Sequence, residues 1–268
     1  MTQVADTEAP VDDEDDDDTP SKSGIDAYLP NRRDALFLLG GSLVGGLVGF
    51  EAAGVTAEKA AVAPDRNDGT VMTYKRARTT LEEGNARYVA GQPLRPDQTV
   101  SRRSALAAGQ HPFAAVLSCA DSRVAPEVLF DQGLGDLFVV RSAGQVVDRA
   151  VLGSLQYGVE HLEPPLLVVL GHSACGAVKA TLEAVTTKAK ASGTAIDDLV
   201  AAIKPSIVEA EEIGTDEKSM LDVAIALNVE RVVEALKGDH VVGEAVAKRK
   251  LKVIGAVYDL ATGTLDWL

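Results

Sequence analysis

Four short apolar runs, separated by longer amphipathic segments, constrain the fold of this chain more than any other feature. The runs cover residues 113–117, 137–140, 166–170 and 253–257. Their length and their β-branched residues favour buried strands over helices. Helix-length segments lie between them, at about residues 148–161, 175–190 and 221–236. Because strands that alternate with helices form parallel sheets, we expect an α/β fold with a mainly parallel sheet of four to five strands, covered by helices.

A further helix is expected ahead of the first strand. Thr80 is followed by Leu-Glu-Glu, a pattern in which the threonine hydroxyl and the carboxylate of Glu83 can satisfy free backbone amides at a helix start. This capping box predicts a helix that begins at Thr80 and runs to about Ala90.

Charge and hydropathy divide the chain into three parts. The first 34 residues hold eleven acidic and three basic side chains, so they carry −8 of the formal net charge of −14. Residues 1–30 contain too little apolar surface to offset the entropy of ordering, and we expect a disordered acidic tail there. Residues 31–63 combine the pair Arg32-Arg33 with an apolar, glycine-rich stretch, which predicts a twin-arginine export signal. Residues 64–268 are expected to form one compact domain, which contains the predicted strands and helices.

The apolar stretch from Ala35 to Phe50 bears on localisation. A helix that crosses about 30 Å of hydrocarbon needs roughly 20 residues, and this stretch is shorter. An export signal is therefore favoured over a permanent anchor, with cleavage between about residues 58 and 64, where small residues gather. We expect transient contact with the export machinery and a periplasmic, cell-envelope or extracellular protein; a nonfunctional signal would leave it cytoplasmic.

Side chains with metal-binding chemistry follow two of the predicted strands. Cys119, Asp121 and Arg123 come after the first strand, and His172 and Cys175 after the third. Open α/β sheets bind ligands at the carboxyl ends of their strands, and a spacing of three brings His172 and Cys175 to the same side of a turn. Two thiols and one imidazole make three ligands, the number that a catalytic zinc site uses while it leaves a fourth position open. The sequence therefore predicts a zinc site at this edge of the sheet.

Several other classes of protein fit the sequence poorly. The chain has two cysteines, 56 positions apart, so it is no disulfide-framed small protein, although a single bridge between them stays possible. A cysteine phosphatase places five residues between its nucleophile and its arginine, whereas three separate Cys119 from Arg123. The acidic charge gives no reason to expect a nucleic acid partner, because phosphate binding needs clustered basic residues.

Four sequence motifs extend well beyond the candidate ligands. Residues 119–124 are C-A-D-S-R-V and residues 171–176 are G-H-S-A-C-G. Residues 135–144 and 257–263 add two further stretches. In this order and at this spacing, the motifs resemble those of the β-class carbonic anhydrases. The resemblance covers roughly residues 75–268.

The resemblance implies an activity and a role for each candidate residue. The activity is the reversible hydration of carbon dioxide to bicarbonate and a proton by zinc-bound hydroxide, with one Zn²⁺ per chain. Cys119, His172 and Cys175 are the implied zinc ligands. Asp121 is implied to be both a catalytic residue and a conditional fourth ligand, and Arg123 the catalytic residue that holds Asp121 off the metal. A homodimer or homotetramer is implied as well.

One position departs from the pattern of some family members, which carry a tryptophan three residues before the first cysteine. That tryptophan belongs to a noncatalytic bicarbonate pocket that stabilises the closed form of the site. This chain has Val116 there, and its single tryptophan is Trp267. We therefore expect a resting site with water, rather than Asp121, on the metal near neutral pH.

Two other functions remain open for the same residues. The scaffold could hydrolyse another small linear electrophile, such as carbon disulfide. Alternatively, Asp121 could permanently complete a noncatalytic zinc site, although Arg123 argues against this because a purely structural site has no need to restrain the carboxylate. As proton shuttles, three histidines qualify by chemistry alone: His111, His161 and His240.

Overall fold

The computed structural model describes residues 71–214 and 216–268. The predicted acidic tail, residues 1–30, and the predicted signal segment, residues 31–63, lie outside the described residues, as do the first residues of the expected compact domain. Among the described residues, no helix is both long enough and apolar enough to cross a membrane.

A five-stranded sheet forms the centre of the fold, and its strands lie in the order β2-β1-β3-β4-β5. The three pairings β2-β1, β1-β3 and β3-β4 are parallel, and β5 runs antiparallel to β4. The strands are β1 (Ala114–Cys119), β2 (Leu137–Ser142), β3 (Leu166–His172), β4 (Lys252–Tyr258) and β5 (Leu265–Trp267). The predicted α/β fold with a mainly parallel sheet is therefore confirmed.

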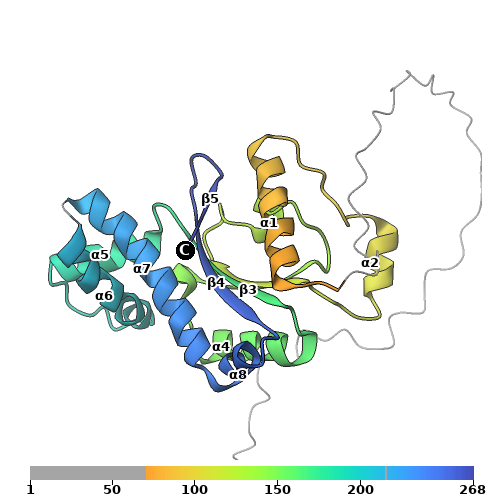
Figure 1. Cartoon of the computed structure of the whole chain (residues 1–268). Helices are drawn as coiled ribbons and strands as arrows, with labels where there is room; N and C mark the ends of the chain where they lie inside the picture. The colour runs from red at the N-terminus through yellow and green to blue at the C-terminus, as the bar shows by residue number, and fades with distance from the viewer. Residues whose placement is uncertain (1–70, 215) are drawn as a thin grey trace, which may run out of the picture. The chain divides into compact units, whose positions relative to one another are not determined.

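Helices cover the sheet and extend beyond its carboxyl edge (Figure 1). They are α1 (Tyr74–Val89), α2 (Val100–Leu106), α3 (Pro126–Leu129), α4 (Arg149–Tyr157), α5 (Gly176–Thr186), α6 (Ile196–Ile213), α7 (Glu217–Gly238) and α8 (His240–Ala247). Two shorter elements are the 3₁₀ turn η2 (Ala143–Gln145) and the π-helix η3 (Gly158–Leu162), which continues α4.

The central strands β1 and β3 are buried on both faces, which explains their continuous apolar sequence. Successive side chains of a strand point to opposite faces. Accordingly, Val116 packs in one core cluster with residues of α1 and α3, whereas Leu117 packs in a second cluster with residues of α4, α7 and α8. A third cluster, built from α5, α6 and α7, surrounds Cys119 and Cys175. The cysteines thus lie where the sheet meets a helical layer.

The capping box predicted at Thr80 is wrong. The first helix begins six residues earlier, at Tyr74, where the Thr73 hydroxyl accepts a hydrogen bond from the backbone N–H of Arg76 at 3.3 Å. Thr80 lies inside the helix and its hydroxyl donates to the carbonyl of Arg76 at 2.9 Å. A threonine hydroxyl that bonds the carbonyl four residues earlier is tolerated within a helix, so the motif does not have to mark a helix start.

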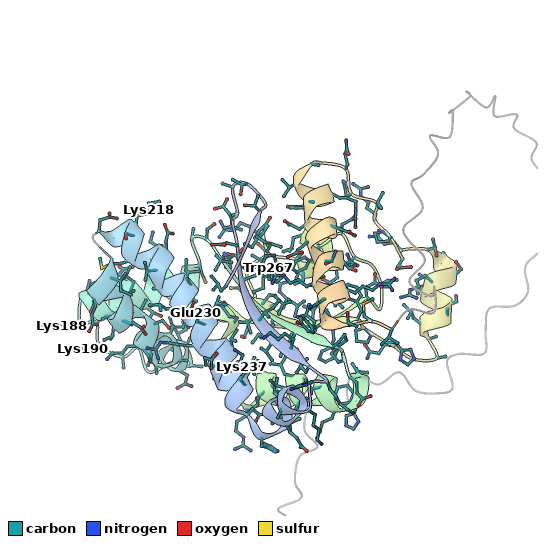
Figure 2. All side chains as sticks on the ribbon, viewed as in Figure 1. Lys188, Lys190, Lys218, Glu230, Lys237 and Trp267 are labelled. Atoms are coloured by element: carbon teal, nitrogen blue, oxygen red, sulfur yellow. The ribbon has the colours of Figure 1, made fainter. Side chains whose placement is uncertain are left out.

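Trp267 lies in β5, beside α1 (Figure 2). The guanidinium of Arg78 in α1 lies 4.8 Å from the centre of its ring, within the range of a cation–π interaction. This tryptophan therefore ties the last strand to the first helix and lines no part of the metal-ligand cluster.

Candidate metal centre

Three side chains with ligand chemistry meet at the carboxyl edge of the sheet. Cys119 and His172 are the last residues of β1 and β3, which are parallel neighbours, and Cys175 directly precedes α5. All three are buried, and their ligand atoms lie within 4.8 Å of one another. The two sulfur atoms are 4.0 Å apart and both cysteines are free, so the disulfide left open by the sequence is absent from this pair.

A tight turn lets His172 and Cys175 face the same point. Ala174 between them adopts a left-handed conformation with φ of 52°. Ser173 anchors the turn, because its N–H donates to the carbonyl of Tyr258 at 2.8 Å and its hydroxyl accepts from the N–H of Leu260 at 2.9 Å. The turn is therefore held by the end of β4 and the residues after it.

The imidazole of His172 has one nitrogen in a hydrogen bond and the other free to bind a metal. Its Nδ1 lies 3.0 Å from the carbonyl oxygen of Ser173, a contact that places the ring proton on Nδ1. Its Nε2 is buried and has no hydrogen-bond partner. A buried polar atom without a partner calls for an explanation, and a metal ion between this nitrogen and the two sulfur atoms supplies one. The donor set of two sulfurs and one imidazole suits zinc.

The two thiols share one proton. The pKa of Cys119 is lowered to about 4, chiefly because the Cys175 thiol donates a hydrogen bond to it, and the backbone N–H of Gly144 at 3.3 Å from the sulfur also contributes. The same hydrogen bond, together with burial, raises the pKa of Cys175. At neutral pH the pair therefore carries one negative charge, and metal binding must displace the proton on Cys175.

Asp121 lies beside the three ligand atoms, and Arg123 binds both of its oxygens. The backbone N–H and Nε of Arg123 each donate to Oδ1 at 2.9 Å, and Nη2 donates to Oδ2 at 2.7 Å. This guanidinium holds the pKa of Asp121 well below its usual range. Oδ2 is 3.9 Å from Nε2 of His172. The Asp121 carboxylate is thus ionised and lies next to the three candidate ligands, but both of its oxygens are already bound by Arg123 in a bidentate ion pair.

Comparison with known proteins now gives the family. The family model described as carbonic anhydrase matches residues 114–265, more than half of the chain. The chain belongs to this family. It is 46% identical over 201 residues to a carbonic anhydrase of Mycolicibacterium smegmatis, a match that covers 75% of the chain and 94% of that protein. It is 45% identical over 198 residues to carbonic anhydrase 2 of Mycobacterium tuberculosis, covering 74% and 92%.

Solved structures place the chain in the β class of carbonic anhydrases. A structure of tetrameric β-carbonic anhydrases from Sordaria macrospora matches with a TM-score of 0.56 and 29% identity, and covers 71% of this chain and 95% of that one. The Coccomyxa β-carbonic anhydrase in complex with acetazolamide matches with a TM-score of 0.55 and 30% identity, covering 62% and 75%. The chain is therefore a carbonic anhydrase of the β class.

The structure brings together all five residues that the sequence singled out in this carbonic anhydrase. Cys119, His172 and Cys175 form the buried cluster, and Asp121 with Arg123 lies at its side. Their individual roles as ligands and catalytic groups stay predictions. The exposed histidines at 111, 161 and 240 also stay candidate shuttles by chemistry alone.

Two residues of the site were not assigned a role by sequence reasoning. Arg141 in β2 donates through Nε to the carbonyl of Cys119 at 3.0 Å and through Nη2 to the carbonyl of Asp121 at 2.6 Å, so it fixes the backbone that carries both side chains. Gly144 in η2 donates its N–H to the Cys119 sulfur. Both residues belong to the motif at residues 135–144, and this motif was the sequence signal that could have drawn attention to them.

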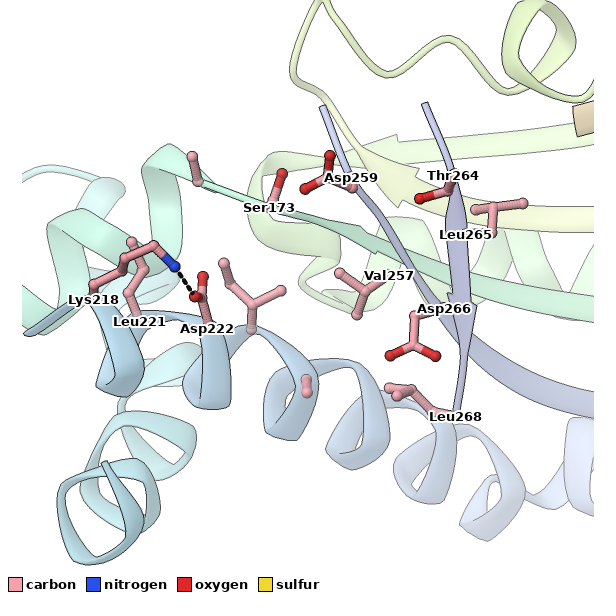
Figure 3. A pocket seen from close by; sticks show the side chains of 13 residues that line it. Ser173, Lys218, Leu221, Asp222, Val257, Asp259, Thr264, Leu265, Asp266 and Leu268 are labelled. Carbon is pink, nitrogen blue, oxygen red and sulfur yellow. Dashed lines mark hydrogen bonds and ion pairs between the residues drawn. The ribbon is translucent and has the colours of Figure 1, made fainter. Parts of the chain in front are cut away.

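A cavity of about 520 Å³ borders Ser173, in the turn between His172 and Cys175, and Figure 3 shows the side chains that line it. It is bounded by α7, the end of β4 and β5, and an ion pair of 2.7 Å between Lys218 and Asp222 lies at its wall. Ser173 and Ala174 line it, whereas the three candidate ligands and Asp121 do not. Size alone therefore does not locate the chemistry of this carbonic anhydrase.

Proposed function

We propose that this chain hydrates carbon dioxide reversibly to bicarbonate and a proton at a zinc ion held by Cys119, His172 and Cys175. The observation that carries the proposal is the unpartnered, buried Nε2 of His172, which lies together with two sulfur atoms beside an ionised carboxylate. The donor set fits one zinc ion per chain. When bound, zinc lowers the pKa of a coordinated water from 15.7 to about 7 and so supplies a nucleophile near neutral pH.

Asp121 has two properties that suit the reaction. Its carboxylate is ionised, so it can accept a hydrogen bond and orient a donor toward a small electrophile such as carbon dioxide. It is also close enough to the centre to compete for the open ligand position, being 3.9 Å from Nε2 of His172. The same group can therefore assist the reaction or block it, depending on where it is held.

Arg123 decides between these two positions of Asp121. Three donated hydrogen bonds, two to Oδ1 and one to Oδ2, favour the position in which the carboxylate is bound by Arg123 rather than by the metal. Arg141 adds a second restraint, because it binds the backbone carbonyls of Cys119 and Asp121. This arrangement supports the expectation of an open resting site, and Val116, buried in the core at the position of the family's tryptophan, is compatible with it.

The proposal is tested on the full chain loaded with zinc, by stopped-flow hydration of carbon dioxide alongside hydrolysis of carbon disulfide. We expect rapid hydration and no measurable carbon disulfide hydrolysis. Carbon disulfide hydrolysis without hydration would replace the proposed substrate. Full zinc occupancy with neither activity would favour a closed, noncatalytic site completed by Asp121.

We also propose that the chain assembles as a homodimer or homotetramer. The support is the resemblance of the whole domain to its family and the match to β-carbonic anhydrases from Sordaria macrospora that are described as tetrameric. The mass of the full chain in solution, measured by light scattering, distinguishes a monomer from either assembly.

A further inference from the structure

A buried asparagine connects α7 to the metal centre. Asn228 is 3% exposed and lies in the stripe of α7 that packs into the core, among apolar residues such as Ile225 and Val229. Its side-chain Nδ2 donates to the carbonyl oxygen of Gly144 at 3.0 Å. Burying an amide costs free energy unless it is hydrogen-bonded, so an apolar residue would suit this stripe better if packing alone were required. The contact to Gly144 accounts for the polar residue at this place.

The turn that Asn228 contacts has an unusual backbone. Gly144 and Gln145 in η2 are both left-handed, with φ of 62° and 46°. A side chain on Gly144 would also be crowded, because its Cβ would lie 2.8 Å from Cδ1 of Ile203. A left-handed conformation is unfavourable for a residue other than glycine, and such a turn persists where its surroundings hold it in place. The hydrogen bond from Asn228 is one such restraint.

The same glycine contacts a candidate ligand. The backbone N–H of Gly144 donates to the sulfur of Cys119 at 3.3 Å. Asn228 and Cys119 thus bind the carbonyl and the N–H of one residue. The N–H and the carbonyl of Gly144 belong to adjacent peptide planes that meet at its flexible Cα, so a hydrogen bond to the carbonyl restrains the backbone angles that direct the N–H. A hydrogen bond to a thiolate withdraws electron density that the sulfur would otherwise donate to the metal, and such outer contacts tune metal sites.

We propose that Asn228 is a positioning residue of the metal centre: it holds the N–H of Gly144 on the Cys119 sulfur and thereby sets how strongly this thiolate donates to the metal. The proposal rests on the proposed function, since it requires a metal on Cys119. It assigns to α7 a role that extends beyond packing.

The test compares cobalt-loaded full-length proteins, because the sulfur-to-cobalt charge-transfer band reports thiolate donation directly. Asn228→Ala removes the donor. Val233→Ala is the matched control, since Val233 is buried in the same helix and packs in the core cluster of α4, α7 and α8, which contains neither cysteine. We expect the band to move to longer wavelength in Asn228→Ala and to stay in place in Val233→Ala. Zinc affinity should fall about 10- to 100-fold in Asn228→Ala alone, because the turn that orients Cys119 among the other ligands is no longer held in place.

Several outcomes would overturn the proposal. One is an unchanged band and unchanged zinc affinity in Asn228→Ala; another is an equal shift in Val233→Ala, which would indicate general loosening of the fold. Failure of the wild-type chain to bind any metal would instead refute the proposed function, so the two failures are distinguishable. A second variant, Asn228→Leu, roughly preserves the volume of the side chain while removing its amide donor, and the same band shift is expected.

If neither variant folds, the wild-type protein still decides the step on which the proposal depends. In protein loaded with ¹¹³Cd, the amide proton of Gly144 should show scalar coupling to the metal through the Cys119 sulfur. Absence of that coupling in a fully loaded protein would overturn the proposal.

Discussion

At the scale of single residues, the position of Asp121 separates an open site from a closed one. Its two oxygens are bound by Arg123 from the backbone N–H, Nε and Nη2. The ion pair is partly exposed, with the Arg123 side chain at 57% and the Asp121 side chain at 16%. Exposed ion pairs contribute little to stability, so the role of this pair is expected in activity rather than in folding.

Replacing Arg123 with alanine should therefore inactivate the enzyme without unfolding it. Asp121 would lose its partner and would be free to act as a fourth ligand of a bound zinc in place of water. The pKa of Asp121 rises toward its usual value but stays below neutral pH, so the carboxylate remains ionised and able to bind. We expect carbon dioxide hydration at pH 7 to fall about 100-fold, with zinc content unchanged.

The matched control for this change is Arg231→Ala. Arg231 lies in α7 and is also a partly exposed arginine, paired with Glu209. Its removal should leave hydration within about twofold of wild type, in keeping with the small contribution of surface ion pairs. An Arg123→Ala enzyme as active as Arg231→Ala would contradict the role given to Arg123.

The thiol pair predicts how many protons leave when zinc binds. At pH 7 Cys119 is a thiolate, because its pKa is lowered to about 4, and Cys175 keeps its proton, because its pKa is raised. Both sulfurs bind zinc as thiolates. Calorimetry of zinc binding at pH 6, where Cys119 is still a thiolate and a zinc-bound water with a pKa of about 7 keeps its proton, should therefore give about one proton released per zinc in two buffers that differ in ionisation enthalpy. Release of two protons would mean that both cysteines are protonated in the metal-free protein.

At the scale of elements, close contact between β3 and α7 supports the metal-binding turn. Gly171 immediately precedes His172, and a Cβ at this position would lie 2.5 Å from Cγ2 of Val229 in α7. Gly171→Ala should force the strand and the helix apart, with a cost of about 1–3 kcal/mol in the free energy of unfolding. Denaturant unfolding of the zinc-free protein measures this cost.

Gly153 in α4 provides the comparison for this substitution. A Cβ added there would meet nothing within 4 Å. Because alanine has a higher helix propensity than glycine, Gly153→Ala should stabilise the protein by about 0.5–1 kcal/mol. Equal effects of the two substitutions would show that the contact between β3 and α7 is looser than the structure indicates.

The strands and the candidate ligands could be predicted from sequence because their signals are local. Apolar runs marked four of the five strands, although β1 and β3 each end two residues later than predicted and include Cys119 and His172 themselves. The short strand β5 follows soon after β4 and has too few residues for a periodic pattern. A local pattern also misplaced the start of α1, where the hydroxyl of Thr80 bonds within the helix.

The parts that sequence did not predict depend on contacts between distant segments. Helix α6 contains Pro205, a residue that argues against a helix interior when sequence alone is considered. Arg141 binds backbone carbonyls about twenty positions earlier in the chain, and Asn228 binds Gly144, 84 positions away. A polar residue within an apolar helical stripe was the one sequence signal for Asn228, and it did not reveal the partner.

At the scale of the whole molecule, we propose that residues 31–63 direct export through a twin-arginine signal. The route would allow the protein to fold and load zinc before export, which protects two reduced cysteines from an oxidising exterior. In a host that has this route, replacing Arg32 and Arg33 with lysines should retain the protein inside the cell. Fractionation with activity assays measures this, and unchanged export of the double variant would refute the signal.

The central claim is that one zinc ion on Cys119, His172 and Cys175 makes this chain a carbon dioxide hydratase. The most direct test is to remove metal from the full chain, restore zinc stepwise, and follow hydration by stopped flow from neutral to moderately alkaline pH. We predict that activity rises in proportion to bound zinc, reaches its maximum at about one zinc per chain, and is absent from Cys175→Ser. Full zinc occupancy without hydration at any pH in this range would contradict the claim.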